Sequence, residues 1–147
     1  MKIFLAILAV FTVFLAACSK DKFATKPRIE VKDYNSKEIG LNGQLTIRLD
    51  YFDKEGDLGT GNFYAVRQRL NIQPLSLSDA DRPDTLRYPL PSFPDKNKGE
   101  IVLQLNYNDF LKESLSKNDT INFKIAVEDR GGNKSDTITT DNIVIVL

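Results

Sequence analysis

Three segments alternate apolar and polar residues with a period of two, and this pattern constrains the fold more than any other feature of the chain. In residues 44–51 the odd positions are apolar and the even positions polar, and residues 100–107 and 121–128 follow the same pattern except at Val102 and Ala126. Successive side chains of a β-strand point to opposite faces of a sheet. The alternation therefore predicts three strands, each with one buried face.

Weaker strand candidates lie between and around these segments. Residues 28–34, 62–70 and 135–140 are candidates, residues 142–147 form a β-branched run suited to a terminal strand, and only residues 108–115 suggest a single helical turn. About seven strands with no long amphipathic helix predict an all-β fold, a single antiparallel immunoglobulin-like β-sandwich.

The N-terminus carries a secretory pattern. Lys2 precedes an apolar run, Ile3 to Ala17, that is shorter than the roughly 20 residues of a membrane-spanning helix, so the run predicts a signal peptide. The end of this run, Leu15-Ala16-Ala17-Cys18, resembles the lipobox of bacterial lipoproteins at every position. The resemblance implies cleavage before Cys18 and acylation of its thiol. An ordinary secretory signal or an uncleaved anchor is the alternative.

The lipobox implies a membrane address. Ser19 stands where an Asp would resemble an inner-membrane retention signal, so we expect a lipid anchor in the outer membrane, on either its periplasmic or its surface side. The expected organisation is a signal peptide over 1–17, a lipidated tether over 18–27 and an immunoglobulin-like β-sandwich domain over 28–147.

Charge and cysteine content exclude several function classes. The chain has 20 basic and 20 acidic residues, and loss of residues 1–17 removes Lys2, so the mature charge is 19 − 20 = −1. No basic field is present to hold nucleic acid. Cys18 is the only cysteine, so no disulfide is expected within the domain.

Residues 121–140 carry a second resemblance. An alternating strand is followed by the turn Asp129-Arg130-Gly131-Gly132-Asn133 and then by a Thr-rich stretch. This order resembles the F–G hairpin of fibronectin type III and related immunoglobulin-like domains. The chain has no Trp and no cysteine pair, which rules out an antibody-type core.

Residues 51–59, with the sequence YFDKEGDLG, carry a third resemblance. They are similar to the Phe-x-Asp-x-Asp-Gly-Asp-Leu-Gly loop of small Bacteroidetes lipoproteins with immunoglobulin-like folds, with Glu55 in place of the middle Asp. With the lipobox and the hairpin, the resemblance covers most of the chain. It implies a fold and a location, and no activity.

The same loop is a candidate calcium site. Asp53, Glu55 and Asp57 place carboxylates at alternate positions, and in an immunoglobulin-like order their loop shares one end of the sandwich with Asp129 and Asn133. Calcium takes six to eight oxygen ligands, which these five side chains and loop carbonyls could supply. The alternative is that Asp53 and Asp57 bond backbone amides to shape a glycine-rich turn.

We expect no catalysis. The chain has no histidine, acylation would remove the one thiol nucleophile, and no nucleophile elbow, phosphate loop or zinc-ligand cluster is present. The surviving hypotheses are a binding or accessory module that contacts an envelope protein or a glycan, a purely structural envelope lipoprotein, and a calcium-stabilised adhesion-type domain.

Residues 73–98 hold five of the six prolines. Leu86, Tyr88 and Leu90 predict an extended piece docked on a sheet edge, with the flanking prolines blocking further strand pairing. Protection of the edge is one interpretation, and a partner-binding surface built on Tyr88 and Phe93 is the other. Asp84-Thr85-Leu86 resembles the Bacteroidetes O-glycosylation motif, with Thr85 as the modified residue.

Overall fold

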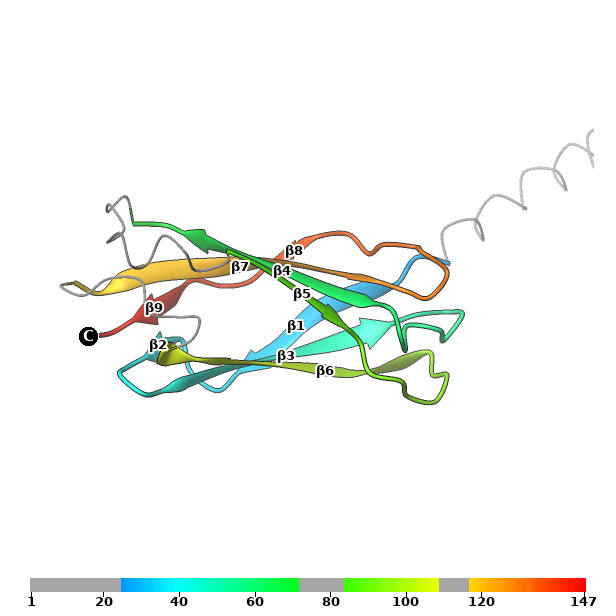
Figure 1. Ribbon diagram of the computed structural model, residues 1–147, viewed down its shortest axis with the longest axis horizontal. Helices are drawn as coiled ribbons and strands as arrows, with labels where there is room; N and C mark the ends of the chain where they lie inside the picture. The colour runs from blue at the N-terminus through cyan, green and yellow to red at the C-terminus, as the bar shows by residue number, and fades with distance from the viewer. Residues whose placement is uncertain (1–24, 72–83, 109–116) are drawn as a thin grey trace, which may run out of the picture.

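Two packed β-sheets form the part of the chain that the computed structural model describes, which comprises residues 25–71, 84–108 and 117–147 (Figure 1). Nine strands lie within these ranges. No helix within these described ranges has the length and hydropathy of a membrane span. The all-β sandwich predicted from the alternation is confirmed.

The smaller sheet has the strand order β1-β3-β6. It consists of β1 (Arg28–Tyr34), β3 (Gln44–Phe52) and β6 (Lys98–Asn106), and both pairings are antiparallel. The β3–β6 register is regular from Gln44 opposite Asn106 to Phe52 opposite Lys98. In β1 the register with β3 shifts between Val31 and Asp33.

The larger sheet has the order β2-β9-β7-β4-β5, and β8 pairs with β7 as well. Its pairings are antiparallel except for the parallel pair β2–β9. The strands are β2 (Glu38–Ile39), β4 (Asn62–Arg69), β5 (Thr85–Pro89), β7 (Asp119–Glu128), β8 (Ile138–Thr139) and β9 (Ile143–Ile145).

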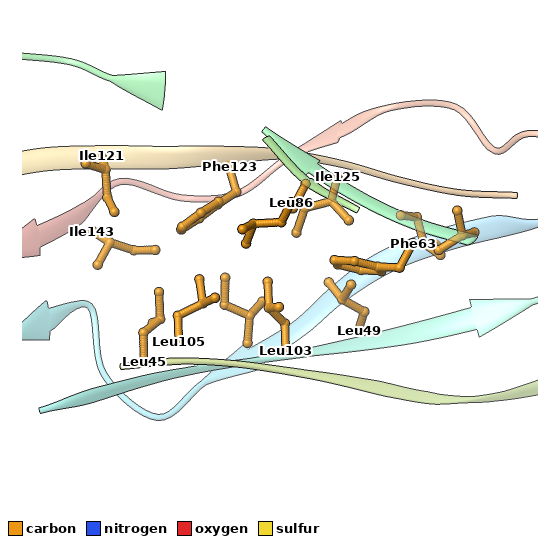
Figure 2. Close-up of a cluster of buried hydrophobic side chains, with 14 of the residues drawn as sticks. Leu45, Leu49, Phe63, Leu86, Leu103, Leu105, Ile121, Phe123, Ile125 and Ile143 are labelled. Carbon is orange, nitrogen blue, oxygen red and sulfur yellow. The ribbon is translucent and has the colours of Figure 1, made fainter. Parts of the chain in front are cut away.

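The core lies between the two sheets, where the apolar sets of the alternating strands meet (Figure 2). The odd residues predicted to be apolar point inward from β3, β6 and β7, and the even residues point outward. Burial of this apolar area is the main term that stabilises a chain without disulfides. The side chains at the centre include Leu45, Leu49, Leu103, Leu105, Phe63, Leu86, Ile121, Phe123, Ile125 and Ile143.

The second strand of the predicted hairpin is shorter than the sequence pattern suggests. The candidate 135–140 contributes only β8, Ile138–Thr139. On either side, a hydroxyl replaces a backbone carbonyl as the acceptor: the Val127 N–H donates to Ser135 Oγ (3.0 Å) and the Phe123 N–H to Thr140 Oγ1 (2.9 Å). These side-chain bonds compete with a regular strand ladder, which shortens β8.

The expected edge strand is present, and one short strand is additional to those predicted. The extended piece after the proline-rich stretch is β5, at the edge of the larger sheet, with Leu86 and Leu90 buried. The two-residue strand β2 has no alternation for a sequence pattern to detect, and it was not predicted. The predicted helical turn over 108–115 lies, except for Asn108, outside the described residues.

A pair of leucine substitutions tests this packing. Leu45 is fully buried, whereas Leu41, four residues earlier, is 67% exposed. Leu45→Ala is expected to lower the free energy of unfolding by about 2–5 kcal/mol, because it removes buried atoms and leaves a cavity. Leu41→Ala should change it by less than about 0.5 kcal/mol. Urea denaturation of the two variants measures both effects, and equal effects would contradict the assigned core.

Candidate metal centre

Three carboxylates meet at one end of the sandwich. Asp53 and Asp57 lie in the loop between β3 and β4, and Asp129 follows β7 directly. One carboxylate oxygen from each lies within 4.8 Å of the others. Oxygens that share one calcium ion at 2.3–2.6 Å can be at most about 5 Å apart. The spacing therefore fits three ligands of a single cation.

A tight turn places the first two carboxylates. The Gly56 N–H donates to the Asp53 carbonyl (3.2 Å), and the Glu55 N–H donates to Asp53 Oδ1 (3.3 Å). Gly56 has φ +74°, a conformation that glycine adopts without steric cost. The turn breaks the period-two alternation, so that Glu55 is exposed while Asp53 is buried.

Backbone bonds hold this loop to its two neighbours. The Arg130 N–H donates to the Asp57 carbonyl (3.2 Å), which joins the loop to the segment after β7. The Lys96 N–H donates to the Gly56 carbonyl (3.1 Å), and the Asp53 N–H donates to the Asn97 carbonyl (2.8 Å). Three segments that are far apart in sequence therefore fix the position of the carboxylates.

Asn133 orients Asp129. Its backbone N–H donates to Asp129 Oδ1 (2.8 Å), and its Nδ2 donates to Asp129 Oδ2 (2.9 Å). An ionised carboxylate offers about four acceptor sites, so these bonds leave Asp129 with capacity for a metal ion. Asn133 supports a ligand through its amide nitrogen.

Two oxygens of the cluster lack a hydrogen-bond donor. Asp53 Oδ2 and Asp57 Oδ1 are buried, and neither has a hydrogen-bond partner among the described residues. Asp53 as a whole is only 2% exposed. A buried acceptor without a partner costs about 1–3 kcal/mol, and more when it is charged. A cation between these oxygens would remove that cost.

The electrostatics of the cluster also favour a cation. Burial raises the pKa of the Asp53 carboxyl, and the negative charges of Asp57 and Asp129 raise it further, while backbone hydrogen bonds oppose the shift in part. Without a cation, the charged form of Asp53 is thus destabilised by burial and by its neighbours. The positive charge of a divalent ion would lower the pKa of Asp53 and favour its charged form.

A glycine borders the carboxylates. A Cβ atom placed on Gly131 would lie 3.2 Å from Asp129 Oδ1 and 3.7 Å from Asp57 Oδ2. Any larger residue would extend into the space next to these oxygens. The missing side chain at position 131 therefore keeps the space beside the cluster open.

The donor set selects the class of metal. The three clustered groups are carboxylates, and the chain contains no histidine. Hard oxygen donors suit calcium or magnesium, and irregular loops suit calcium, which tolerates variable geometry. Of the five residues predicted for this site, Asp53, Asp57 and Asp129 form the cluster, Asn133 supports it, and Glu55 is not part of the carboxylate group.

The other predicted site residues lie elsewhere. Tyr88 and Phe93 both border a groove of about 460 Å³ between β5 and β6. Tyr88 is 44% exposed, whereas Phe93 is half-buried and its ring lies 5.9 Å from that of Tyr51. Thr85 is exposed at the start of β5. Cys18 lies outside the described residues.

Asp53 generates a pH-dependent prediction for the metal-free protein. Because its pKa is raised in the folded state, the Asp53 carboxyl binds more proton in the folded protein than in the unfolded chain at pH values between its unfolded and folded pKa. The free energy of unfolding in the presence of a chelator should therefore fall as the pH rises through the folded pKa. Asp53→Asn cannot ionise and should flatten this fall. Urea denaturation over a pH series tests the prediction, and an unchanged slope in Asp53→Asn would contradict it.

Comparison of the chain with models of known protein families and with curated proteins found no match. The lipobox, loop and hairpin resemblances therefore rest on their motifs alone. What the structure itself establishes is a small all-β protein with two packed sheets.

Proposed function

We propose that this chain is a non-catalytic, lipid-anchored module of the outer membrane whose β-sandwich is stabilised by calcium. The observation that carries the proposal is the Asp53, Asp57 and Asp129 cluster, with two buried oxygens that lack donors. Turn formation alone accounts for Asp53 Oδ1, which accepts the Glu55 N–H. It leaves Asp53 Oδ2 and Asp57 Oδ1 without a function, and a calcium ion supplies one.

Calcium would act by joining loops. Asp53 and Asp57 come from one loop and Asp129 from another, and backbone bonds tie the first loop both to the second and to the segment before β6. An ion that bridges them binds the folded state only, because the unfolded chain separates the carboxylates. Calcium sites in extracellular modules have dissociation constants of about 10⁻⁴–10⁻³ M. An envelope protein would meet calcium in that range outside the cytoplasm.

The metal centre lies at the end of the domain where the expected tether enters. Arg28, the first residue of β1, pairs with Phe52, the residue before Asp53. Just before β1, Lys26 forms an ion pair with Asp136 in the segment between β7 and β8. The calcium ion would thus brace the end of the sandwich through which the lipid anchor holds the protein.

A binding role accounts for the groove better than a purely structural role does. The groove is bordered by Tyr88 and Phe93, the residues predicted for partner contact, together with Val102 on β6. Exposed apolar side chains gathered along a groove are typical of interaction surfaces. The module would therefore act by contact and not by catalysis.

Thermal unfolding of the full chain tests calcium binding. At 10 mM calcium, a site of the expected affinity should raise the midpoint by about 5–10 °C relative to chelator. Asp53→Asn and Asp129→Asn should abolish the rise. Asp136→Asn, at a carboxylate that is 92% exposed, is the matched control and should keep it. If wild type and Asp53→Asn respond equally to calcium, the ion binds elsewhere and the proposal fails.

The lipid anchor is tested separately. Cys18→Ser removes the only thiol of the chain and is expected to abolish incorporation of a labelled fatty acid and release the protein from the outer-membrane fraction. Ser19→Ala, at the adjacent position, should leave both unchanged. Retained labelling in Cys18→Ser would show that the chain is not acylated at this residue.

A further inference from the structure

The free edges of the two sheets differ in their protection. In the described part of the chain, β5 ends in Pro89 and is followed by Pro91, β1 carries a register shift after Val31, and β2 has two residues. Prolines, bulges and short strands all prevent edge-to-edge pairing. Strand β6 has none of these: it has nine residues, no proline and a regular register. It is the one long edge in the described residues that is open to a further strand.

The backbone of β6 presents its bonding groups at this edge. Beyond the two ends of the strand, the Asp53 N–H donates to the Asn97 carbonyl and the Tyr107 N–H to the Gly43 carbonyl. Because antiparallel residues alternate between facing the partner strand and facing away, the odd residues of β6 bond to β3. The N–H and C=O groups of Glu100, Val102 and Gln104 therefore point away from β3, toward the open edge.

An apolar groove runs beside this edge. Its walls include Val102 on β6 and Tyr88 on β5, and Leu103 also borders it. Val102 is 50% exposed and Tyr88 is 44% exposed, both high values for large apolar residues on strands. A strand added to β6 would cover Val102 and partly fill the groove.

We propose that the occupant is the β6 strand of a second copy of this chain, paired antiparallel about a two-fold axis at Val102. In this register Val102 lies opposite Val102 of the second copy. Glu100 lies opposite Gln104, and Lys98 lies opposite Asn106. The outward N–H and C=O groups of Glu100, Val102 and Gln104 then meet those of the second strand.

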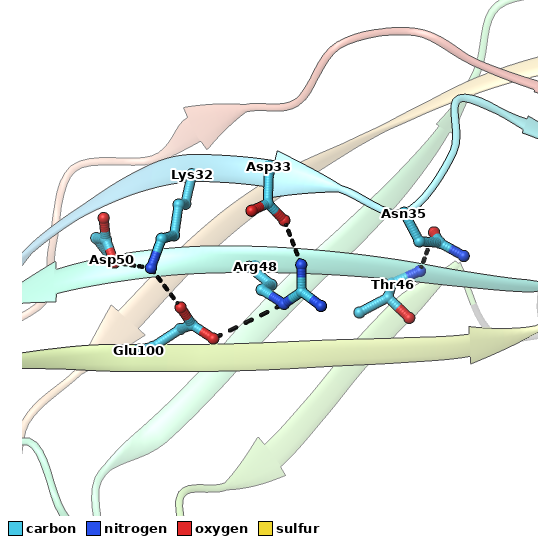
Figure 3. Close-up of polar contacts among 7 residues, drawn as sticks. All are labelled: Lys32, Asp33, Asn35, Thr46, Arg48, Asp50 and Glu100. Atoms are coloured by element: carbon cyan, nitrogen blue, oxygen red, sulfur yellow. Dashed lines mark hydrogen bonds and ion pairs between the residues drawn. The ribbon is translucent and has the colours of Figure 1, made fainter.

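The side chains favour this register. No like charges oppose each other, and Glu100 and Gln104 can form a hydrogen bond across the strands. Glu100 already forms ion pairs within its own sheet with Lys32 (2.6 Å) and Arg48 (3.9 Å), as Figure 3 shows. A register centred on Glu100 would instead place two carboxylates opposite each other. Avoidance of this like-charge contact therefore favours Val102 over Glu100 as the centre.

The product is a closed dimer. A two-fold contact uses the same surface on both copies, so it ends at two chains and does not propagate. The two smaller sheets would become one continuous sheet. Antiparallel pairing sets the tethers at opposite ends of the dimer, and residues 18–25, which precede the ion-paired Lys26, can extend to about 28 Å. Both anchors can therefore reach one bilayer with the paired sheet lying along its surface.

Cysteine trapping in the full chain tests the register. Directly opposed residues have Cα atoms about 5.5 Å apart, within the range of a disulfide. Two Gln104 residues would be four positions apart along the strands, about 13 Å. Under mild oxidation Val102→Cys should become a covalent dimer, and Gln104→Cys should remain a monomer. A mixture of Glu100→Cys and Gln104→Cys chains should also cross-link. The wild-type chain, whose only thiol is that of Cys18, is the control for cross-linking through Cys18.

A second variant tests the dimer without oxidation. Val102→Lys would place two like charges at the two-fold axis, and it should convert the chain from dimer to monomer in sedimentation experiments. Val102→Thr, a β-branched residue of similar size, should remain a dimer. Wild-type chains that sediment as monomers, or cross-linking that is equal in Val102→Cys and Gln104→Cys, would overturn the proposal. Calcium binding, measured by the midpoint shift, is independent of either result.

Discussion

Mutual repulsion among three buried or half-buried carboxylates is the constraint on which the end of this sandwich depends. The fold places Asp53, Asp57 and Asp129 together although burial and like charge both oppose it. Such an arrangement is stable only if something offsets the cost. Neighbouring amide N–H groups offset part of it, at Asp53 Oδ1 and at both oxygens of Asp129. Asp53 Oδ2 and Asp57 Oδ1 receive no such hydrogen bond from the described residues.

The loops that carry these carboxylates also organise their surroundings. Through Lys96 and Asn97, the turn at Gly56 bonds to the segment that leads into β6. Phe93 in the same segment packs near Tyr51 and borders the groove. The carboxylate cluster and the groove are thus joined through residues 93–97. A cation that holds the first would also steady the second, which links the proposed stabilisation to the proposed contact surface.

Much of the fold could be predicted from periodicity, because the odd residues of the segments 45–51, 101–105 and 121–127 are apolar and pack in or against the core. Where side chains replaced backbone groups, prediction was less successful. The hydroxyls of Ser135 and Thr140 accept bonds from β7, which shortened β8 in a way that no alternation reveals. The parallel strand β2 depends on a distant partner, β9, and carries no local signal.

The candidate site could likewise be predicted only in part from the sequence. The spacing of Asp53 and Asp57, with the assumption of an immunoglobulin-like order of strands, was enough to predict that they would meet Asp129. The exposure of Glu55 depends on the turn at Gly56. The hydrogen bond from the amide of Asn133 to Asp129 depends on how the chain folds after β7. The oxygens without donors depend on the full three-dimensional arrangement and could not be derived from the sequence.

The most direct test of the central claim is a crystal structure of the protein grown with calcium, with anomalous data collected to locate the ion. The account predicts an anomalous peak between Asp53, Asp57 and Asp129, at about 2.3–2.6 Å from Asp53 Oδ2 and Asp57 Oδ1. A site without a peak, in which protein donors or ordered waters satisfy those two oxygens at saturating calcium, would contradict it.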